Sequence, residues 1–73
     1  MRLDWHYHTA GKGADLYDLD RNHGTRVGTI SEGPNGDCVA LIREGDGWKR
    51  IAPDQMLFYT QAKQLVEMTV RLS

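Results

Sequence analysis

The sequence has a single cysteine and no long apolar run. Cys38 is the only cysteine among 73 residues, so a disulfide within one chain is excluded. The same fact favours a reducing compartment, because small secreted domains usually depend on several disulfides. No window approaches the roughly 20 apolar residues of a membrane-spanning helix, and the first residues lack the apolar core of a signal peptide. We therefore expect a cytoplasmic protein with no membrane segment.

The chain also lacks an excess of either charge. It has 9 Lys and Arg residues against 10 Asp and Glu, and the net charge is −1. The basic residues are scattered along the chain, so the charge does not steer it strongly toward nucleic acid or an anionic membrane. Because of this charge balance, we expect a protein partner rather than nucleic acid.

No catalytic signature is present either. Ser31 and Ser73 have no neighbouring base, and Cys38 stands where a buried strand residue belongs, which favours a structural thiol. A chain of 73 residues has little room for both a core and a sheltered pocket. We expect a protein that is not an enzyme and needs no cofactor.

The clearest structural signal is the apolar run Cys38–Ile42. Turn residues bound it on both sides, at residues 33–37 and 45–47. A short aliphatic run between turns predicts the central strand of a small sheet, apolar on both faces. We place this strand at residues 37–43, within one domain that spans residues 1–73.

Further stretches have the alternating pattern of strands, at residues 2–8, 14–20, 25–31 and 48–52. Val27 and Ile30 point to opposite faces of the third stretch unless a bulge intervenes, and Gly28 is where a bulge is expected. Asn35-Gly36 is typical of a tight hairpin. Because the connections are short, we predict an antiparallel meander of four or five strands.

The C-terminal segment is predicted to be one amphipathic helix packed on one face of the sheet. Apolar residues recur there at helical spacing, at Phe58, Ala62, Leu65, Thr69 and Leu72. This stripe is wide, because it also includes Tyr59, Val66, Met68 and Val70. The helix begins either with Pro53 as its first residue or with Thr60 as its N-cap, and we prefer Thr60. The fold class is therefore α+β.

One helix covers only one face of a sheet, yet Cys38–Ile42 is apolar on both. The second face requires a cover: a second copy, a partner, or residues 53–59 folding back. Trp5 and Trp48 are expected mainly in the core, because so small a chain needs its large side chains inside. A protein contact, including homodimerisation through the sheet, would use the candidates Trp5, Tyr7, Tyr17, Val39, Leu41 and Trp48.

Two alternatives remain open at this point. The first is a nucleic-acid-binding sheet with Arg26, Arg43, Lys49 and Arg50 toward the phosphates. The second is a metal site, because Asp4, His6 and His8 share one strand face and His23 could approach from a turn. Alternate strand positions are about 6–7 Å apart and no cysteine spacing supports the metal site, so a solvated polar face is preferred.

In length and layout, the whole chain resembles the small stand-alone proteins of bacteriophages and mobile elements. These proteins often inhibit or regulate a host protein, including host defence systems. The resemblance carries over no functional residue, and it implies an inhibitor or regulator, for example of the anti-CRISPR type, that acts by protein–protein contact. The chain begins with Met1 and has no recognisable tag, so we expect a complete small open reading frame.

Overall fold

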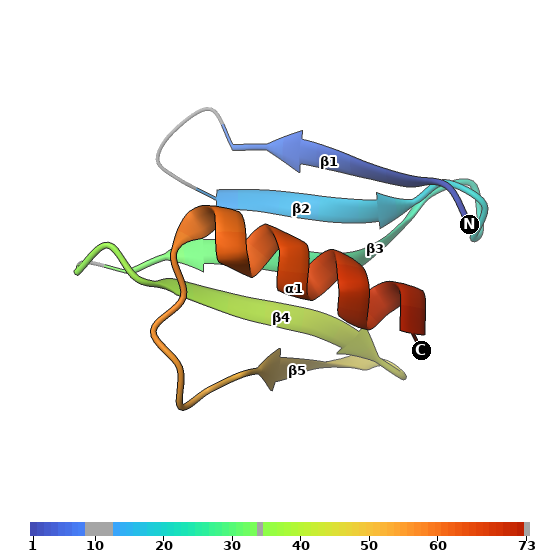
Figure 1. The fold of residues 1–73 in the computed structure, drawn as a ribbon. Coiled ribbons are helices and arrows are strands. Elements are labelled where there is room, and N and C mark those ends of the chain that lie inside the picture. The colour runs from blue at the N-terminus through green and yellow to red at the C-terminus, as the bar shows by residue number, and fades with distance from the viewer. Residues whose placement is uncertain (9–12, 34, 73) are drawn as a thin grey trace.

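A computed structural model describes residues 1–8, 13–33 and 35–72, and it confirms the α+β meander. The elements are β1 (Leu3–Tyr7), β2 (Gly13–Asp18), β3 (Thr25–Glu32), β4 (Cys38–Glu44), β5 (Gly47–Ile51) and α1 (Tyr59–Leu72). The strands form one antiparallel five-stranded sheet in the order β1-β2-β3-β4-β5 (Figure 1). Within the described residues, no helix is long and apolar enough to cross a membrane.

The hairpin predicted between β3 and β4 is present. Gly36 has a positive φ of 85°, which glycine adopts at low cost, and its N–H donates to the Gly33 carbonyl at 3.2 Å. The sequence predicts Pro34 at an early turn position and a glycine-rich loop at residues 9–13. Pro34 and residues 9–12 lie outside the described residues.

The bulge predicted in β3 is also present. Leu16 pairs with Gly28 and the next residue, Tyr17, pairs with Arg26, so Val27 is the extra residue of β3. The bulge lets Val27 join Ile30 on the buried face, where their exposed fractions are 6% and 0%. Without this extra residue, strict alternation would turn one of the two side chains toward solvent.

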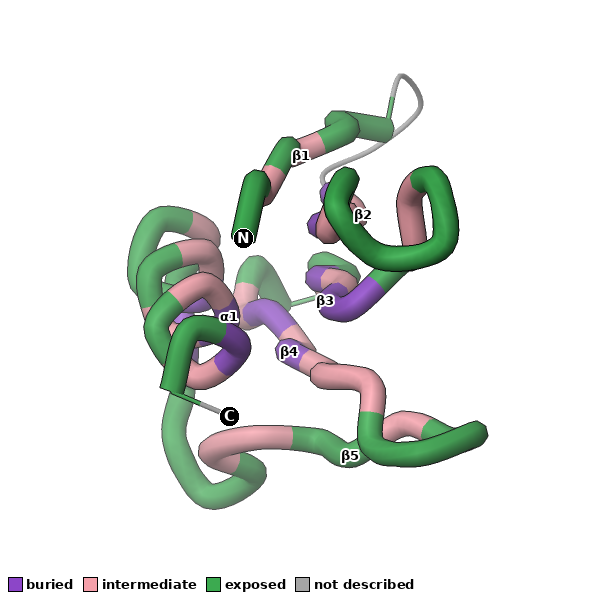
Figure 2. The backbone as a smooth tube through the Cα atoms, turned by 90° about the vertical axis from the view of Figure 1, so that its right-hand side faces the viewer, coloured by how far each residue is buried: buried purple, intermediate pink, exposed green. Residues whose placement is uncertain are grey.

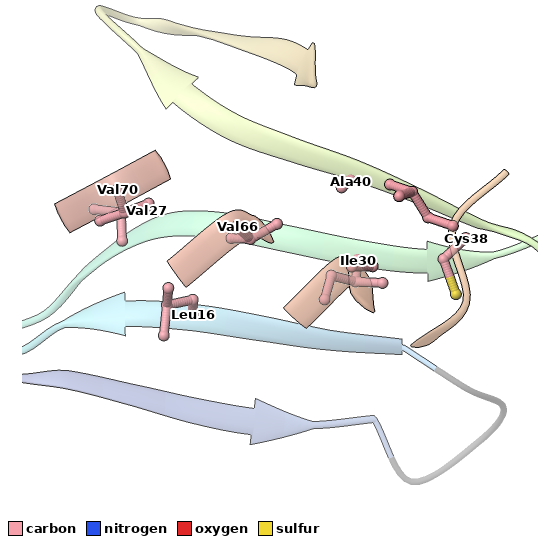
Figure 3. Close-up of a cluster of buried hydrophobic side chains, with 9 residues drawn as sticks. Leu16, Val27, Ile30, Cys38, Ala40, Val66 and Val70 are labelled. Carbon is pink, nitrogen blue, oxygen red and sulfur yellow. The ribbon is translucent and has the colours of Figure 1, made fainter. Parts of the chain in front are cut away.

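The helix α1 lies across β3 and β4 on one face of the sheet, and the core is packed between them (Figures 2 and 3). Gly28 allows this close approach. A Cβ atom at Gly28 would lie 2.5 Å from Cγ1 of Val66, which is closer than real contacts allow. The absence of a side chain at this position therefore sets how near the helix comes to β3.

The helix begins at Tyr59, so the prediction of Thr60 as the N-cap is wrong. The N–H of Phe58 donates to Oε1 of Gln61 at 3.2 Å, which is half of a capping box. The preceding residue, Leu57, accepts a hydrogen bond from the N–H of Cys38 at 2.7 Å. This attachment to β4 fixes where the chain turns into the helix, and no propensity signal reports it.

The predicted apolar stripe is only partly the buried one. Ala62, Val66 and Val70 are buried, whereas Phe58 is 61% exposed and Leu72 is 82% exposed. The three buried residues all belong to the wide predicted stripe, and the rest of that stripe stays partly or largely exposed. Small side chains face the sheet because the larger ones do not fit so close to β3 and β4.

Residues 53–59 do not fold back over the second face of the sheet, so that interpretation is wrong. The segment passes the end of β5 and pairs with the start of β4 through Leu57 and Cys38. Leu57 is 6% exposed and belongs to the same core as the helix residues. The segment thus packs on the helix side of the sheet, and it does not cover the opposite side.

Candidate interaction surface on the open sheet face

We call the face of the sheet that points away from α1 the open sheet face. Cross-strand partners point to the same side of a sheet, so the strand register defines its rows. The middle row consists of His6, Asp15, Thr29, Leu41 and Arg50. The row on one side of it consists of Asp4, Tyr17, Arg26, Arg43 and Trp48. The row on its other side includes Ser31 and Val39. The register therefore brings aromatic, aliphatic and basic side chains from all the strands onto one surface.

No element in the described part of the chain packs on this face, because α1 lies on the opposite one (Figure 2). Tyr17, Leu41 and Trp48 are half-buried by their neighbours in the sheet. The open sheet face therefore presents large side chains that are already held in place but still accessible.

Two arginines flank Trp48. The Cζ atoms of Arg26 and Arg43 lie 4.9 Å and 5.2 Å from the centroid of the Trp48 ring. These are cation–π distances, and each such contact is worth on the order of 0.5–2 kcal/mol. Nε of Arg43 also donates to the carbonyl of Arg26 at 2.9 Å. We call Arg26, Arg43 and Trp48 the Trp48 cluster.

The positive charge of this region is only partly balanced. Nη1 of Arg26 lies 3.7 Å from Oδ1 of Asp15, a long ion pair. Of the residues that the structure describes, no carboxylate forms an ion pair with Arg43 or Arg50. These two guanidinium groups thus have no ion-pair partner among residues 1–8, 13–33 and 35–72.

Asp15 is the enclosed acid of the middle row, with a side chain that is 17% exposed. Burial acts to raise its pKa, but a hydrogen bond from Oγ1 of Thr29 at 2.7 Å lowers it. The contact with Nε2 of His8 at 3.2 Å and the charge of Arg26 lower it further, and the net pKa of Asp15 lies below its usual value. Asp15 is therefore a fixed negative charge at neutral pH.

Of the four metal candidates, the structure brings only Asp4 and His6 together. Nε2 of His6 contacts Oδ2 of Asp4 at 2.9 Å, while His8 contacts Asp15. His23 lies in the turn after β2, at the end of β1 opposite to His8. Within residues 1–8, 13–33 and 35–72, no group of three His, Cys, Asp or Glu side chains could hold a metal ion.

The protein-binding candidates divide between the two faces. Tyr17, Val39, Leu41 and Trp48 lie on the open sheet face. The expectation of Trp48 in the core is wrong, because Trp48 is not part of the buried cluster and its ring lies against Arg26 and Arg43.

The other two candidates lie on the helix side of the edge strand β1. Trp5 packs against the core, and its Nε1 donates to Oε1 of Glu67 at 3.3 Å. Tyr7 is hydrogen-bonded to Nζ of Lys63, whose ammonium also lies over both aromatic rings. These contacts brace the helix against β1.

The nucleic-acid candidates divide in the same way. Arg26, Arg43 and Arg50 lie on the open sheet face, whereas Lys49 shares the helix side with Ile42. Nζ of Lys49 lies 3.8 Å from Glu44, so its charge is partly balanced. Three of the basic residues are therefore on one surface.

A second surface was not predicted from the sequence. A groove of about 340 Å³ lies between the segment before α1 and the helix, and its lining is Gln55, Met56, Leu57, Gln61, Gln64, Leu65 and Met68. Met56 and Met68 are 69% and 54% exposed. The signal that could have located this groove was the width of the apolar helix stripe, which is greater than one buried face requires.

The predicted role of Cys38 as a buried thiol is confirmed, since the residue is 3% exposed. The groove beside α1 has no titratable side chain in its lining. A smaller hollow of about 210 Å³ at the opposite end of the helix contains Asp18, Arg21 and Arg43, and its lining has no cysteine, serine or histidine.

Comparisons with protein-family models, with curated proteins and with solved structures found no match to this chain.

Proposed function

We propose that this protein is a non-enzymatic protein-binding module that contacts its partner through the open sheet face. The observation that carries the proposal is the placement of Trp48, Tyr17 and Leu41 on a face that nothing in the described chain covers. Interfaces are enriched in tyrosine, tryptophan and arginine relative to the rest of a protein surface. The open sheet face has this composition.

The rigidity of the surface supports the same proposal. Trp48 is held by two guanidinium groups, and the rings of Tyr17 and His6 lie 4.6 Å apart at their centroids. Side chains that are already ordered lose less conformational entropy when a partner binds. Binding hot spots are commonly aromatic and arginine side chains held in this manner.

The groove beside α1 is the competing surface. It offers methionines, which adapt to many partners, and glutamine amides, but its lining carries no charge. Nothing in it favours one partner over another, whereas the open sheet face combines apolar, aromatic and charged groups. We therefore assign partner binding to the open sheet face.

The test is affinity capture from a lysate with matched surface variants. Leu41→Asp changes the middle of the open sheet face, and Met68→Asp makes the same chemical change in the groove beside α1. We expect captured proteins that Leu41→Asp loses and Met68→Asp retains. Circular dichroism of each variant ensures that a loss of capture is not a loss of folding.

Capture that depends on Met68 and not on Leu41 would move the binding site to the groove. Capture that neither substitution changes would remove the proposal altogether. Homodimerisation through the sheet stays a prediction, and light scattering coupled to size exclusion tests it directly. The narrower interpretation, an inhibitor encoded by a bacteriophage or mobile element, likewise stays a prediction.

A second candidate function has one specific observation in its favour. Arg26, Arg43 and Arg50 share the open sheet face with Trp48, and sheet-based readers of nucleic acid combine basic and aromatic side chains in this way. Binding to single-stranded or duplex DNA that weakens steeply as salt rises would support it. An absence of binding at low salt would end it.

A further inference from the structure

We propose that the Trp48 cluster together with Arg50 forms a carboxylate-binding site, and that the partner presents an acidic segment to it. This inference rests on the proposed function, because it names the chemistry of the partner that the open sheet face recognises. The site consists of two guanidinium groups on the Trp48 ring and a third on the next outward-facing position of β5.

The geometry of Arg43 is suited to an anion. Its Nε is occupied by the carbonyl of Arg26, which orients the guanidinium over Trp48. Its terminal NH₂ groups have no carboxylate partner within the described residues. A guanidinium held in one plane can donate two parallel hydrogen bonds to one carboxylate, and this geometry makes arginine selective for planar anions.

The electrostatics favour the same ligand. Arg26 and Arg43 both lie within about 5 Å of one ring, so two like charges are held together. The electrostatic repulsion between two such charges destabilises the fold unless a nearby anion or water offsets it. Of the three arginines on this face, Asp15 forms an ion pair only with Arg26, at 3.7 Å. Its carboxylate oxygens also contact Thr29 and His8. Asp15 therefore offsets only part of the repulsion between Arg26 and Arg43, and a carboxylate from a partner would reduce the remainder.

The remaining charges of this face argue for a protein segment over a nucleic-acid strand. Asp4 and Asp15 lie on the same face, and the net charge of the chain is −1. A continuous phosphate backbone would meet both acids, whereas a carboxylate side chain needs only a local positive site. The Trp48 cluster is local, because its three residues come from the adjacent strands β3, β4 and β5 and gather around one ring.

The neighbours of the site define the partner further. Leu41 pairs with Arg50 across β4 and β5, and Arg43 is the next residue of β4 on this face. An aliphatic side chain is thus set between positive groups. The complementary segment has acidic residues on both sides of an apolar one.

The experiment uses a capped peptide in which glutamates flank a leucine, with a matched peptide that has glutamine in place of each glutamate. Each is titrated into isotope-labelled protein, and NMR follows the indole N–H of Trp48 and the Nε–H of Arg43. We expect saturable shifts at both groups with the acidic peptide alone. Binding should weaken as ionic strength rises from about 10 mM to about 150 mM.

Matched variants locate the site. Arg43→Gln should raise the Kd by roughly tenfold or more, because it removes charge-assisted hydrogen bonds. Arg50→Gln should also weaken binding and is the variant least able to disturb folding, since Arg50 is exposed. Lys49→Gln removes a neighbouring charge on the opposite side of β5, and it should leave the Kd within about twofold.

Three results would overturn the inference. The first is equal binding of the acidic and glutamine peptides, and the second is binding that Arg43→Gln and Arg50→Gln leave unchanged. The third is tighter, arginine-dependent binding of oligothymidine, which would make nucleic acid the ligand. If capture still depends on Leu41 in either of the first two cases, only the acidic-segment inference fails and the proposed function stands. The third result would favour the nucleic-acid alternative over the proposed function.

Discussion

Among single residues, Asp15 illustrates how a charge is kept within the middle row of a sheet. Its carboxylate is engaged by Thr29, His8 and Arg26, and its pKa lies below the usual value. A carboxyl group whose pKa is lowered on folding stabilises the fold above its unfolded pKa of about 3.9. That stabilisation is lost as the pH falls through the folded pKa.

Removal of the Thr29 hydrogen bond should make this acid sensitivity smaller. Thr29→Val removes the hydroxyl that donates to Asp15, so the pKa of Asp15 should rise toward its ordinary value. The free energy of unfolding should then change less as the pH is lowered from about 5. Urea denaturation at a series of pH values measures the slope, and NMR titration of the Asp15 carboxyl measures the pKa.

Thr69→Val is the matched control, because that hydroxyl donates to the carbonyl of Leu65 and not to an acid. It should leave both the Asp15 titration and the acid slope unchanged. An Asp15 pKa that is the same in Thr29→Val and in the unmodified protein would contradict the assigned role of Thr29.

Within the elements, the start of α1 shows competition between local signals and long-range attachment. Thr60 has the better intrinsic preference for an N-cap, but the helix begins earlier, after the backbone bond between Cys38 and Leu57. Gln61 then reaches back to the N–H of Phe58. The cap in use is therefore a side chain at the third helical position.

Because of this arrangement, two neighbouring alanine substitutions should differ in how much they lower the free energy of unfolding. Gln61→Ala removes the acceptor for Phe58 and should lower the free energy of unfolding by about 0.5–1 kcal/mol. Thr60→Ala should change it by less than about 0.5 kcal/mol, because Thr60 is an exposed residue inside the helix. Chemical denaturation of both variants measures the difference. The reverse order of effects would restore Thr60 as the cap.

For the molecule as a whole, the narrow margin of stability is the governing property. A domain of 73 residues retains roughly 3–5 kcal/mol of net stability, and its core is a single cluster under one helix. Leu16 is one of the largest fully buried side chains of that cluster. The loss of one such side chain is comparable in energy to the whole margin.

Leu16→Ala should therefore leave much of the protein unfolded. The expected cost is about 2–5 kcal/mol, from lost burial and the cavity left behind. Leu72→Ala is the control on an 82% exposed leucine and should stay within about 0.5 kcal/mol of the unmodified protein. Thermal unfolding followed by circular dichroism compares them. A cooperative transition of Leu16→Ala near that of the unmodified protein would contradict this account of the core.

The elements could be predicted because the physics that forms them is local. The pattern of Cys38–Ile42, the Asn35-Gly36 turn and the glycine at the β3 bulge each act over a few residues. The candidate site could be predicted only in part. Tyr17, Leu41 and Trp48 were identified as binding candidates, but nothing in the sequence placed Arg26 and Arg43 on the Trp48 ring.

By itself, the sequence determined the strands, their antiparallel order, the buried thiol at Cys38 and the presence of more apolar surface than one helix covers. Only the tertiary structure decided which residues share a face. It separated Trp5 from Trp48, it brought Arg26 and Arg43 to the Trp48 ring, and it placed Val66 of the helix against Gly28. The physical reason is that a face depends on register, on the bulge and on helix docking. Each of these three is set by contacts between residues that are far apart in the chain.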